Sequence, residues 1–255
     1  MAPAEMQRQV EERSALEAAS GSRGKRAFVR AMFSDIAPRY DLLNHLLSFN
    51  TDKRWRRRAI RALGWEREPA GLFLDLCAGT LDVAAELSAH PGFAGTIIGA
   101  DFAEPMLRAG TAKIGGRPVH AVAADALALP LPDRSAAGAV VAFGARNLAD
   151  LDAGLAEVHR VLRPGARFVI LEFSTPRLRV VRAAYHLYFH HVLPRIGALV
   201  SGNWSAYRYL PASVQHFPSA AELSERMRQA GFREVRWESL TLGIAAIHTG
   251  VRTQD

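Results

Sequence analysis

The chain has 255 residues, of which 49% are hydrophobic, so it can bury one substantial core. Its single cysteine, Cys77, excludes a disulfide framework, and no apolar run reaches the length of about 18 residues that a transmembrane helix needs. The net charge of +7 fits an anionic partner, either nucleic acid or an anionic membrane surface, and composition does not separate the two.

The first quarter of the chain divides into two segments. Residues 1–25 are polar, small and charged, and we expect a disordered tail there, followed by a single domain over residues 26–255. Residues 26–65 are rich in apolar side chains and predict a helical cap, or a lid whose polar groups, such as Tyr40 and Asn44, face a ligand.

A stripe of arginines lies on one face of a predicted helix in this segment, namely Arg54, Arg57, Arg58 and Arg61. The stripe is either a solvated face or a contact for acidic lipid headgroups, and it lacks a recognisable nucleic-acid-binding module.

The stretch from Leu72 to Asp101 predicts a strand, a small-residue loop, a helix and a second strand. Small residues such as Gly79 let a ligand approach the backbone, and we interpret Cys77 as a packing residue of the same loop. Asp101 ends the second strand, where an acid accepts hydrogen bonds from ribose hydroxyls. The loop lacks the G-x-G-x-x-G pattern of dinucleotide sites, so it favours S-adenosylmethionine (SAM) over a nicotinamide cofactor.

Later strands also end in polar residues. The strand over residues 119–124 leads to Asp125, and the strand over residues 139–143 leads to Arg146 and Asn147.

Residues 177–215 interrupt the alternation of strands and helices, and we expect a helical insertion lining an apolar pocket. Its three histidines lack the spacing of metal ligands, so no metal site is expected. Strands over residues 234–240 and 244–251 are separated by a hairpin-length turn, which predicts an antiparallel last strand.

Several segments together resemble one protein family. They are residues 32–41, 47–49, 75–82, 143–147, 171–174, 191–197, 207–210 and 248–250. The Asp-x-x-x-Gly-Thr element indicates only a class I methyltransferase, whereas Phe-Gly-x-Arg-Asn with Tyr-Arg-Tyr-Leu is specific. From Val29 to Arg252 the chain resembles the UbiE/MenG family of SAM-dependent quinone C-methyltransferases.

The resemblance implies a Rossmann-like α/β fold, the three-layer sandwich of class I SAM-dependent methyltransferases. Its seven-stranded sheet is mostly parallel with an antiparallel last strand. The family's SAM contacts fall on Thr80, Asp101, Asp125 and Ala126, and Ala142 stands where some members have a serine contact. We add Asp75, Gly79, Asp82 and Phe102 as expected cofactor-binding residues. The family usually has glycine where Leu81 stands. Leucine there either strains the backbone by about 1 kcal/mol or crowds the methionine end of SAM.

The resemblance also implies the reaction, which is methylation of a ring carbon in a reduced polyprenylated quinol. Arg146 would stabilise the oxyanion and Asn147 would orient the ring, while Tyr40, His248 and Glu172 are weaker candidates for base or positioning. We expect a cytoplasmic protein whose apolar tunnel takes the prenyl tail, with peripheral contact to an anionic membrane.

Some questions stay open at this point. The sequence does not distinguish a naphthoquinol from a benzoquinol, that is, menaquinone from ubiquinone biosynthesis, although we favour demethylmenaquinol as the substrate. A catalytically silent scaffold in a quinone-synthesis assembly is the rival interpretation, and Leu81 is the residue that favours it. The oligomeric state, including a homodimer, is also open.

Overall fold

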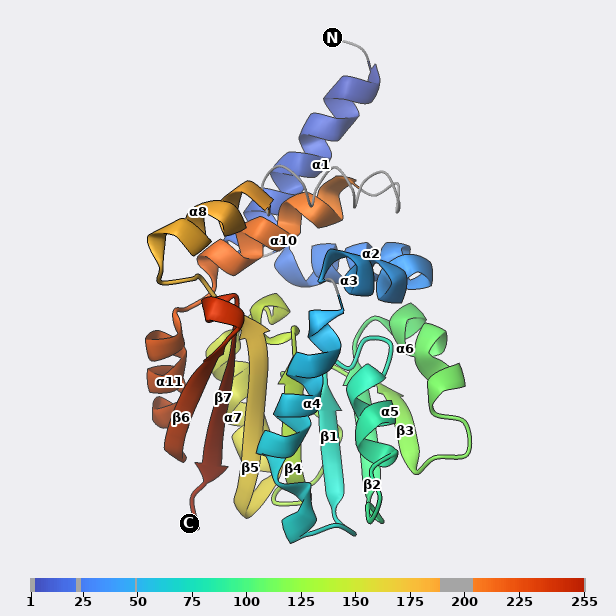
Figure 1. The fold of residues 1–255 in the computed structure, drawn as a ribbon. Helices are drawn as coiled ribbons and strands as arrows, with labels where there is room; N and C mark the ends of the chain where they lie inside the picture. Colours follow the sequence, from blue (N-terminus) through green and yellow to red (C-terminus); the bar gives the residue numbers. More distant parts are fainter. Residues whose placement is uncertain (1–2, 22–23, 49, 189–203, 255) are drawn as a thin grey trace.

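The computed structural model describes residues 3–21, 24–48, 50–188 and 204–254. A twisted sheet with helices on both faces forms the body, and a group of helices lies above the upper edge of the sheet (Figure 1). We call this group the roof. It consists of α1 (Pro3–Ala19), α2 (Lys25–Ile36), α3 (Tyr40–Leu47), α8 (Arg179–Leu187) and α10 (Trp204–His216).

The sheet has seven strands in the order β3-β2-β1-β4-β5-β7-β6. Their bounds are β1 Leu72–Leu76, β2 Thr96–Asp101, β3 Val119–Ala123, β4 Ala136–Ala142, β5 Leu162–Phe173, β6 Phe232–Leu240 and β7 Ala245–Arg252. β7 runs antiparallel to both of its neighbours, and the pairs among β1 to β5 are parallel. This arrangement confirms the predicted fold class. The carboxyl ends of the parallel strands point toward the roof, which places ligand-binding loops beneath it.

Helices cover the two faces of the sheet because successive side chains of a strand point to opposite sides. Phe73 packs with α4 (Thr51–Leu63) and α5 (Asp82–Ser88), whereas its neighbour Leu74 packs on the side of α7 (Leu151–Val161) and α11 (Ala220–Gln229). α6 (Glu104–Gly110) lies beside β2 and β3. Short 3-10 helices are η1 Ala37–Arg39, η2 Trp65–Arg67, η3 Thr111–Lys113, η4 Ala145–Asn147 and η6 Thr241–Gly243.

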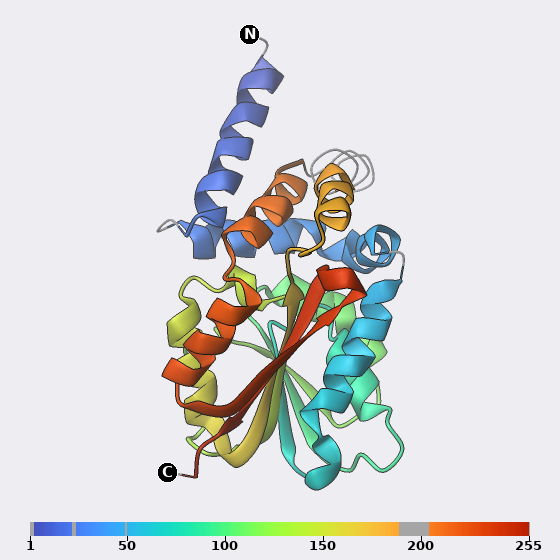
Figure 2. The same cartoon turned by 60° about the vertical axis from the view of Figure 1, so that its left-hand side comes forward.

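The N-terminal segment differs from the predicted disordered tail. Residues 3–19 form helix α1, which packs against α10 and rises above the body (Figures 1 and 2). Ala15, Ala18 and Ala19 are buried in this contact, and Glu12 forms an ion pair with Arg208 of α10. Alanines give little apolar signal in a sequence, and the partner helix lies near the other end of the chain. Most residues of α1 favour a helix, and tertiary packing against α10 stabilises it further.

The predicted insertion over residues 177–215 contains α8 and α10. Residues 189–203 lie outside the described residues, and with them His190, His191 and the family-like segment over residues 191–197.

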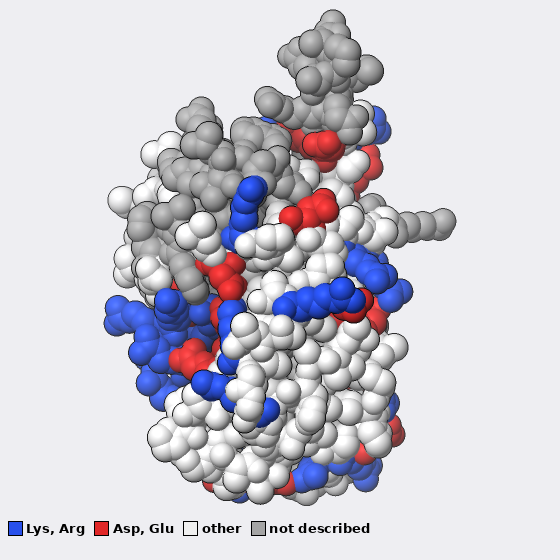
Figure 3. Space-filling view, turned by 90° about the vertical axis from the view of Figure 1, so that its right-hand side faces the viewer, with Lys and Arg blue, Asp and Glu red and all other residues white. Residues whose placement is uncertain are grey.

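The arginine stripe of α4 lines a hollow of about 320 Å³ on the surface. Arg54, Arg57, Arg58 and Arg61 line it together with Thr51, Trp55, Leu240 and Thr241. Figure 3 shows basic side chains gathered at its left edge, where α4 lies. Arg58 donates to both carboxylate oxygens of Glu238, at 2.6 and 2.9 Å, so part of this charge is balanced.

Candidate active site

Two adjoining cavities lie between the sheet and the roof. The larger has a volume of about 420 Å³ and the smaller about 50 Å³. Phe33, Tyr40 and Phe143 line both cavities, so ligands in the two would meet at these aromatic rings. A shared wall of this kind suits a reaction between two bound molecules.

The smaller cavity is formed at the carboxyl ends of β1, β2 and β4 and by the loop after β3. Six of the nine predicted cofactor residues line it, namely Gly79, Asp101, Phe102, Asp125, Ala126 and Ala142. The buried Asp101 carboxylate is held by two backbone N–H groups, since Oδ2 accepts from Gly79 at 2.9 Å and Oδ1 from Ala103 at 2.8 Å. Burial raises the pKa of Asp101, and these N–H groups oppose that rise. The carboxylate is therefore fixed in orientation before any ligand binds.

Arg26, at the start of α2, reaches the same cavity. Its Nη2 lies 2.8 Å from Oδ2 of Asp125, while Oδ1 of Asp125 accepts from the backbone N–H of Leu127 at 3.0 Å. Sequence reasoning missed Arg26 because it lies far along the chain from every loop of the cavity. A ligand amino group that binds Asp125 would share the carboxylate with this guanidinium or displace it.

The backbone is strained around the smaller cavity. Cys77, Leu81 and Phe143 have φ values of 50°, 63° and 59°, in the left-handed region that disfavours residues with a Cβ. Cys77 and Phe143 line the cavity, and Leu81 follows the loop residue Thr80. Strain of this kind concentrates at functional sites, where the surrounding structure enforces it.

The structure resolves the two alternatives for Leu81. Its backbone is left-handed, so the strain is present, but its side chain is fully buried and lines neither cavity. The side chain packs over Gly99 of β2, where an added Cβ would lie 2.4 Å from Leu81 Cδ2. Leucine is accommodated by the glycine on the neighbouring strand and does not crowd the cavity.

Three predicted cofactor residues, Asp75, Thr80 and Asp82, line neither cavity. Asp75 lies beneath the loop, where its Oδ2 accepts from the backbone N–H of Ala84 at 3.0 Å, and burial raises its pKa to about 7. The hydroxyl of Thr80 donates to Asp41 of α3. These side chains support the loop from behind.

Asp82 connects this loop to the roof and to α4. Its Oδ1 accepts from Nζ of Lys113 at 2.7 Å, and its Oδ2 lies 3.3 Å from Nη2 of Arg56. Lys113 also pairs with Asp41. The loop after β1 is thus tied by charge to α3, α4 and η3.

The larger cavity is mainly apolar and is enclosed by α2, α3, α8 and α10 from above. Aromatic side chains supply much of its wall, namely Phe33, Tyr40, Trp55, Phe143, Phe173, Tyr185, Tyr188 and Tyr209. The indole N–H of Trp55 donates to Oγ1 of Thr241 at 2.9 Å, which fixes the wall between this cavity and the arginine hollow. A cavity of this size and lining suits an apolar ligand.

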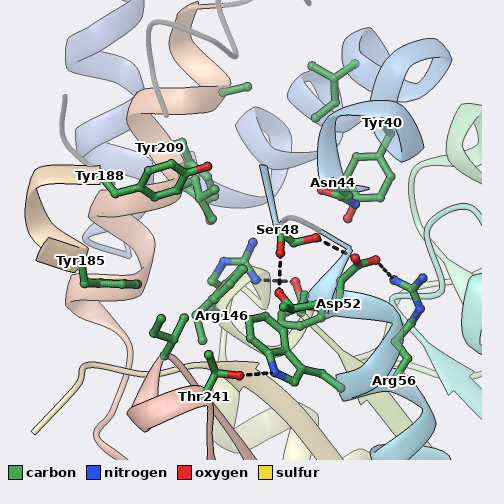
Figure 4. Close-up of a pocket in the computed structure, with 18 of the residues that line it drawn as sticks. Tyr40, Asn44, Ser48, Asp52, Arg56, Arg146, Tyr185, Tyr188, Tyr209 and Thr241 are labelled. Atoms are coloured by element: carbon green, nitrogen blue, oxygen red, sulfur yellow. Dashed lines mark hydrogen bonds and ion pairs between the residues drawn. The ribbon is translucent and has the colours of Figure 1, made fainter. Parts of the chain in front are cut away.

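Arg146, on η4, is a buried cation in the wall of the larger cavity (Figure 4). Its Nη1 lies 2.7 Å from Oε1 of Glu172, and its guanidinium carbon lies 5.4 Å from the centre of the Phe173 ring. Nζ of Lys25 donates to the carbonyl of Arg146 at 2.9 Å, and burial followed by the charge of Arg146 lowers the pKa of Lys25. Nε of Arg146 has no hydrogen-bond partner among the described residues. The Arg146 guanidinium is therefore held in place by Glu172, and its Nε–H remains able to donate a hydrogen bond.

The other predicted catalytic residues divide between the cavities and the sheet. Asn147 lines the smaller cavity, and its Oδ1 accepts from the Tyr209 hydroxyl at 3.1 Å. Tyr40 lines both cavities, and burial raises its pKa. His248 lines neither cavity, because it lies in β7 with Nε2 2.9 Å from the carbonyl oxygen of Ala220, and burial lowers its pKa. Glu172 also lines neither cavity, and its carboxylate pairs with Arg146.

Sequence reasoning named Tyr40 and Asn44 on the cap but missed the polar row to which they belong. Tyr40, Asn44, Ser48, Asp52 and Arg56 follow one another at intervals of four residues, and all line the larger cavity. The spacing of four residues among apolar neighbours is the sequence signal that could have identified the row. A single helix would show this spacing as one face, but here the row spans two helices, α3 and α4, joined through Asn50 with a φ of 58°.

Comparisons with known proteins agree with this geometry. The model of the ubiE/COQ5 methyltransferase family matches residues 20–252. A demethylmenaquinone methyltransferase of Thermus thermophilus is 51% identical over 224 residues, covering 87% of this chain and all of that protein. A ubiquinone/menaquinone biosynthesis C-methyltransferase UbiE of Geobacter sulfurreducens is 46% identical and covers 87% of each chain.

Solved structures of distant proteins share the fold. A SAM-dependent methyltransferase from Thermotoga maritima matches with a TM-score of 0.61 at 18% identity, covering 88% of this chain and 99% of that one. A phosphoethanolamine N-methyltransferase of Haemonchus contortus, solved with SAM, matches with a TM-score of 0.56 at 13% identity, covering 76% of this chain and 52% of that one. By the matched length and the identity of its relatives, the chain belongs to the ubiE/COQ5 methyltransferase family.

Proposed function

We propose that this protein transfers a methyl group from SAM to a ring carbon of a polyprenylated quinol, converting demethylmenaquinol into menaquinol. The observation that carries the proposal is the apolar cavity that shares Phe33, Tyr40 and Phe143 with the smaller cavity and has Arg146 in its wall. The names of the relatives from Thermus thermophilus and Geobacter sulfurreducens support a quinone substrate. Because the side chain of Leu81 avoids the cavity, the residue that favoured a silent scaffold no longer does so.

The residues of the smaller cavity fit SAM, which supplies an electrophilic methyl group when bound. Asp101 would hold the ribose hydroxyls, Asp125 the adenine amino group, and Gly79 would allow close approach of the loop. The volume of this cavity is about 50 Å³, whereas small-molecule sites have volumes of about 300 Å³ or more. The cavity therefore has to widen when SAM binds. Arg26 and Phe33 both belong to α2, and an outward shift of α2 would open the cavity and release Asp125.

The chain's own contribution to catalysis is alignment and charge. The Arg146 guanidinium stabilises the oxyanion of the ring and so lowers the pKa of the ring hydroxyl, which makes the neighbouring carbon nucleophilic. Tyr209 fixes the amide of Asn147, which orients the ring at the junction of the cavities. The aromatic wall excludes water and holds the start of the prenyl tail.

Calorimetry with SAM tests the cofactor site, and methylation assays test the substrate. We expect the wild type to bind SAM and Asp101→Ala to bind it about 10- to 100-fold more weakly, because two hydrogen bonds to a charged group are lost. Asp35→Ala, at an exposed carboxylate of α2, is the matched control. Short-chain demethylmenaquinol and demethoxyubiquinol analogues then decide between the two rings. The proposal would be overturned if the wild type did not bind SAM, or if it methylated neither of the two analogues.

The substrate tail also implies a membrane contact, which we propose lies beside the arginine hollow. Leu178, Val180, Leu187 and Leu242 are exposed large hydrophobic residues, with exposed fractions of 59%, 82%, 61% and 66%. Leu242 follows Thr241, which lines both the hollow and the larger cavity. Arginines next to exposed leucines suit an anionic bilayer. Among the residues that the structure describes, no helix is long and apolar enough to cross a membrane.

Co-sedimentation with vesicles tests this contact. We expect binding to vesicles that contain phosphatidylglycerol and little binding to pure phosphatidylcholine. Arg54→Ser with Arg61→Ser should weaken binding about tenfold or more, given about 1 kcal/mol for each basic residue. The matched control is Arg226→Ser with Arg228→Ser on α11, which covers the other face of the sheet. Equal binding by both double variants would show that the membrane contact lies elsewhere.

A further inference from the structure

The larger cavity has one polar corner, which the chemistry described above does not use. Asn44, Ser48, Asp52 and Arg56 lie there in a row, on α3, at the end of α3 and on α4 (Figure 4). The remaining wall is mainly apolar and aromatic. A polar corner in an apolar cavity fixes how a ligand with polar ends is oriented.

Asp52 is the only acidic residue among the described residues that line the larger cavity. Its residue is 4% exposed, and Ser48 and Arg56 are among the neighbours that hold its carboxylate. Ser48 Oγ donates to Oδ1 at 2.6 Å, and Arg56 Nη1 lies 2.7 Å from Oδ2. Arg56 and Asp52 thus form a buried ion pair. The corner therefore presents a fixed carboxylate to the ligand.

Hydrogen-bonding capacity separates Asp52 from the other polar groups of the cavity. Arg56 and Arg146 only donate, and the hydroxyl and amide side chains both donate and accept. An ionised carboxylate only accepts. A quinol carries two O–H donors, whereas the oxidised quinone carries only carbonyl acceptors. Among the described residues of the cavity wall, the carboxylate is thus the group that distinguishes the two oxidation states of the same ring.

We propose that Asp52 accepts a hydrogen bond from a ring hydroxyl and thereby selects the quinol over the quinone. The inference rests on the proposed function and names the oxidation state that the site recognises and the residue responsible. A quinone in the same pose places a carbonyl lone pair against a buried carboxylate, so the two acceptors repel each other and the carbonyl is left without a donor. Only the reduced ring has a nucleophilic carbon, so this selection keeps an unreactive ring out of the cavity.

The test compares the dissociation constants of one ring in its two oxidation states, without SAM and under nitrogen. The probe is 2-methyl-3-geranyl-1,4-naphthoquinone and its dithionite-reduced quinol, because this ring has no free carbon for methylation or for addition of the Cys77 thiol. We expect the wild type to bind the quinol about tenfold more tightly or better, as for a hydrogen bond to a charged group. In Asp52→Asn the ratio of the quinone dissociation constant to the quinol dissociation constant should fall to about one. The reason is that the asparagine amide can also donate a hydrogen bond to a quinone carbonyl.

Two further variants separate this role from a structural one. Asp41→Asn changes a carboxylate of the same charge network that does not line the larger cavity, and it should keep the wild-type ratio. Ser48→Ala removes a donor that competes for Asp52, so the ratio should stay at or above the wild-type value. A wild-type ratio near one, an unchanged ratio in Asp52→Asn, or a lost ratio in Ser48→Ala overturns the inference. Failure of the wild type to methylate the demethyl analogue instead refutes the proposed function, whatever the ratio.

Discussion

The two cavities are built in different ways. The smaller one is formed by strand ends and loops within residues 77–149, with Arg26, Phe33 and Tyr40 added from the roof. The larger one is formed by side chains of helices from both ends of the chain, including Met32 of α2 and Tyr209 of α10. Backbone turns fix the first, and packing between distant helices fixes the second. The cofactor side is therefore a local property of the chain, and the substrate side is a property of its tertiary structure.

The strongest test of this separation removes the cation of the larger cavity. Arg146→Leu combined with Glu172→Gln avoids leaving a buried carboxylate unpaired, which would destabilise the fold. We expect kcat to fall by about 100- to 1000-fold, as for the loss of an oxyanion donor. Calorimetry should show SAM affinity within about twofold of wild type. Glu172→Gln alone is the control. A matching loss of SAM affinity would show that the two cavities are not independent.

A second test concerns Asp75, which supports the loop of the smaller cavity. Its pKa in the folded protein is about 7, raised from 3.8 by burial, so the folded state holds a proton that the unfolded state has released. Stability from this group is therefore complete below about pH 4 and is lost as the pH rises toward about 7. We expect the free energy of unfolding to fall by about 2–3 kcal/mol between about pH 5 and about pH 8.

Asp75→Asn should remove that fall while keeping an acceptor for the Ala84 N–H. Urea titration at several pH values measures the free energy in both proteins. A fall of equal size in the variant would assign the pH dependence to other groups.

The smallest expected effect concerns the contact between Leu81 and Gly99. Gly99→Ala places a Cβ 2.4 Å from Leu81 Cδ2 and should destabilise the protein by about 1–2 kcal/mol through overpacking. In a Leu81→Ala background the same change should cost much less, because the space is free. Urea titration of the four proteins gives the coupling energy of the pair. Additive effects would mean that Leu81 moves aside without loss, and that the glycine is not what accommodates it.

Local patterns predicted several strands and part of the smaller cavity, and the family resemblance supplied the seven-stranded sheet. Asp101 and Gly79 belong to a strand–loop–helix unit whose geometry follows from nearby residues, and both line the cavity. The same motif also contains Thr80 and Asp82, yet their side chains turn toward Asp41 and Lys113. A motif predicts where the backbone goes, and neighbours from other elements decide where each side chain points.

Residues that depend on distant helices were not predictable in this way. Arg26 meets Asp125 only after α2 has packed over the sheet edge. Helix α1 was interpreted as disordered because its buried face consists of alanines that require α10 as a partner. His248 lies in a family-like segment but is fixed within the sheet against Ala220.

The contact between α1 and α10 has a consequence for biosynthesis. The ribosome releases α1 first and α10 only after five strands of the sheet have been made, so the first helix waits for its partner during most of translation. Until then the faces that α1 and α10 bury in each other stay exposed to water. The parallel strands β1 to β5 can pair in the meantime. A chain that stops before α10 would carry the cofactor loops and no enclosed space for the quinol.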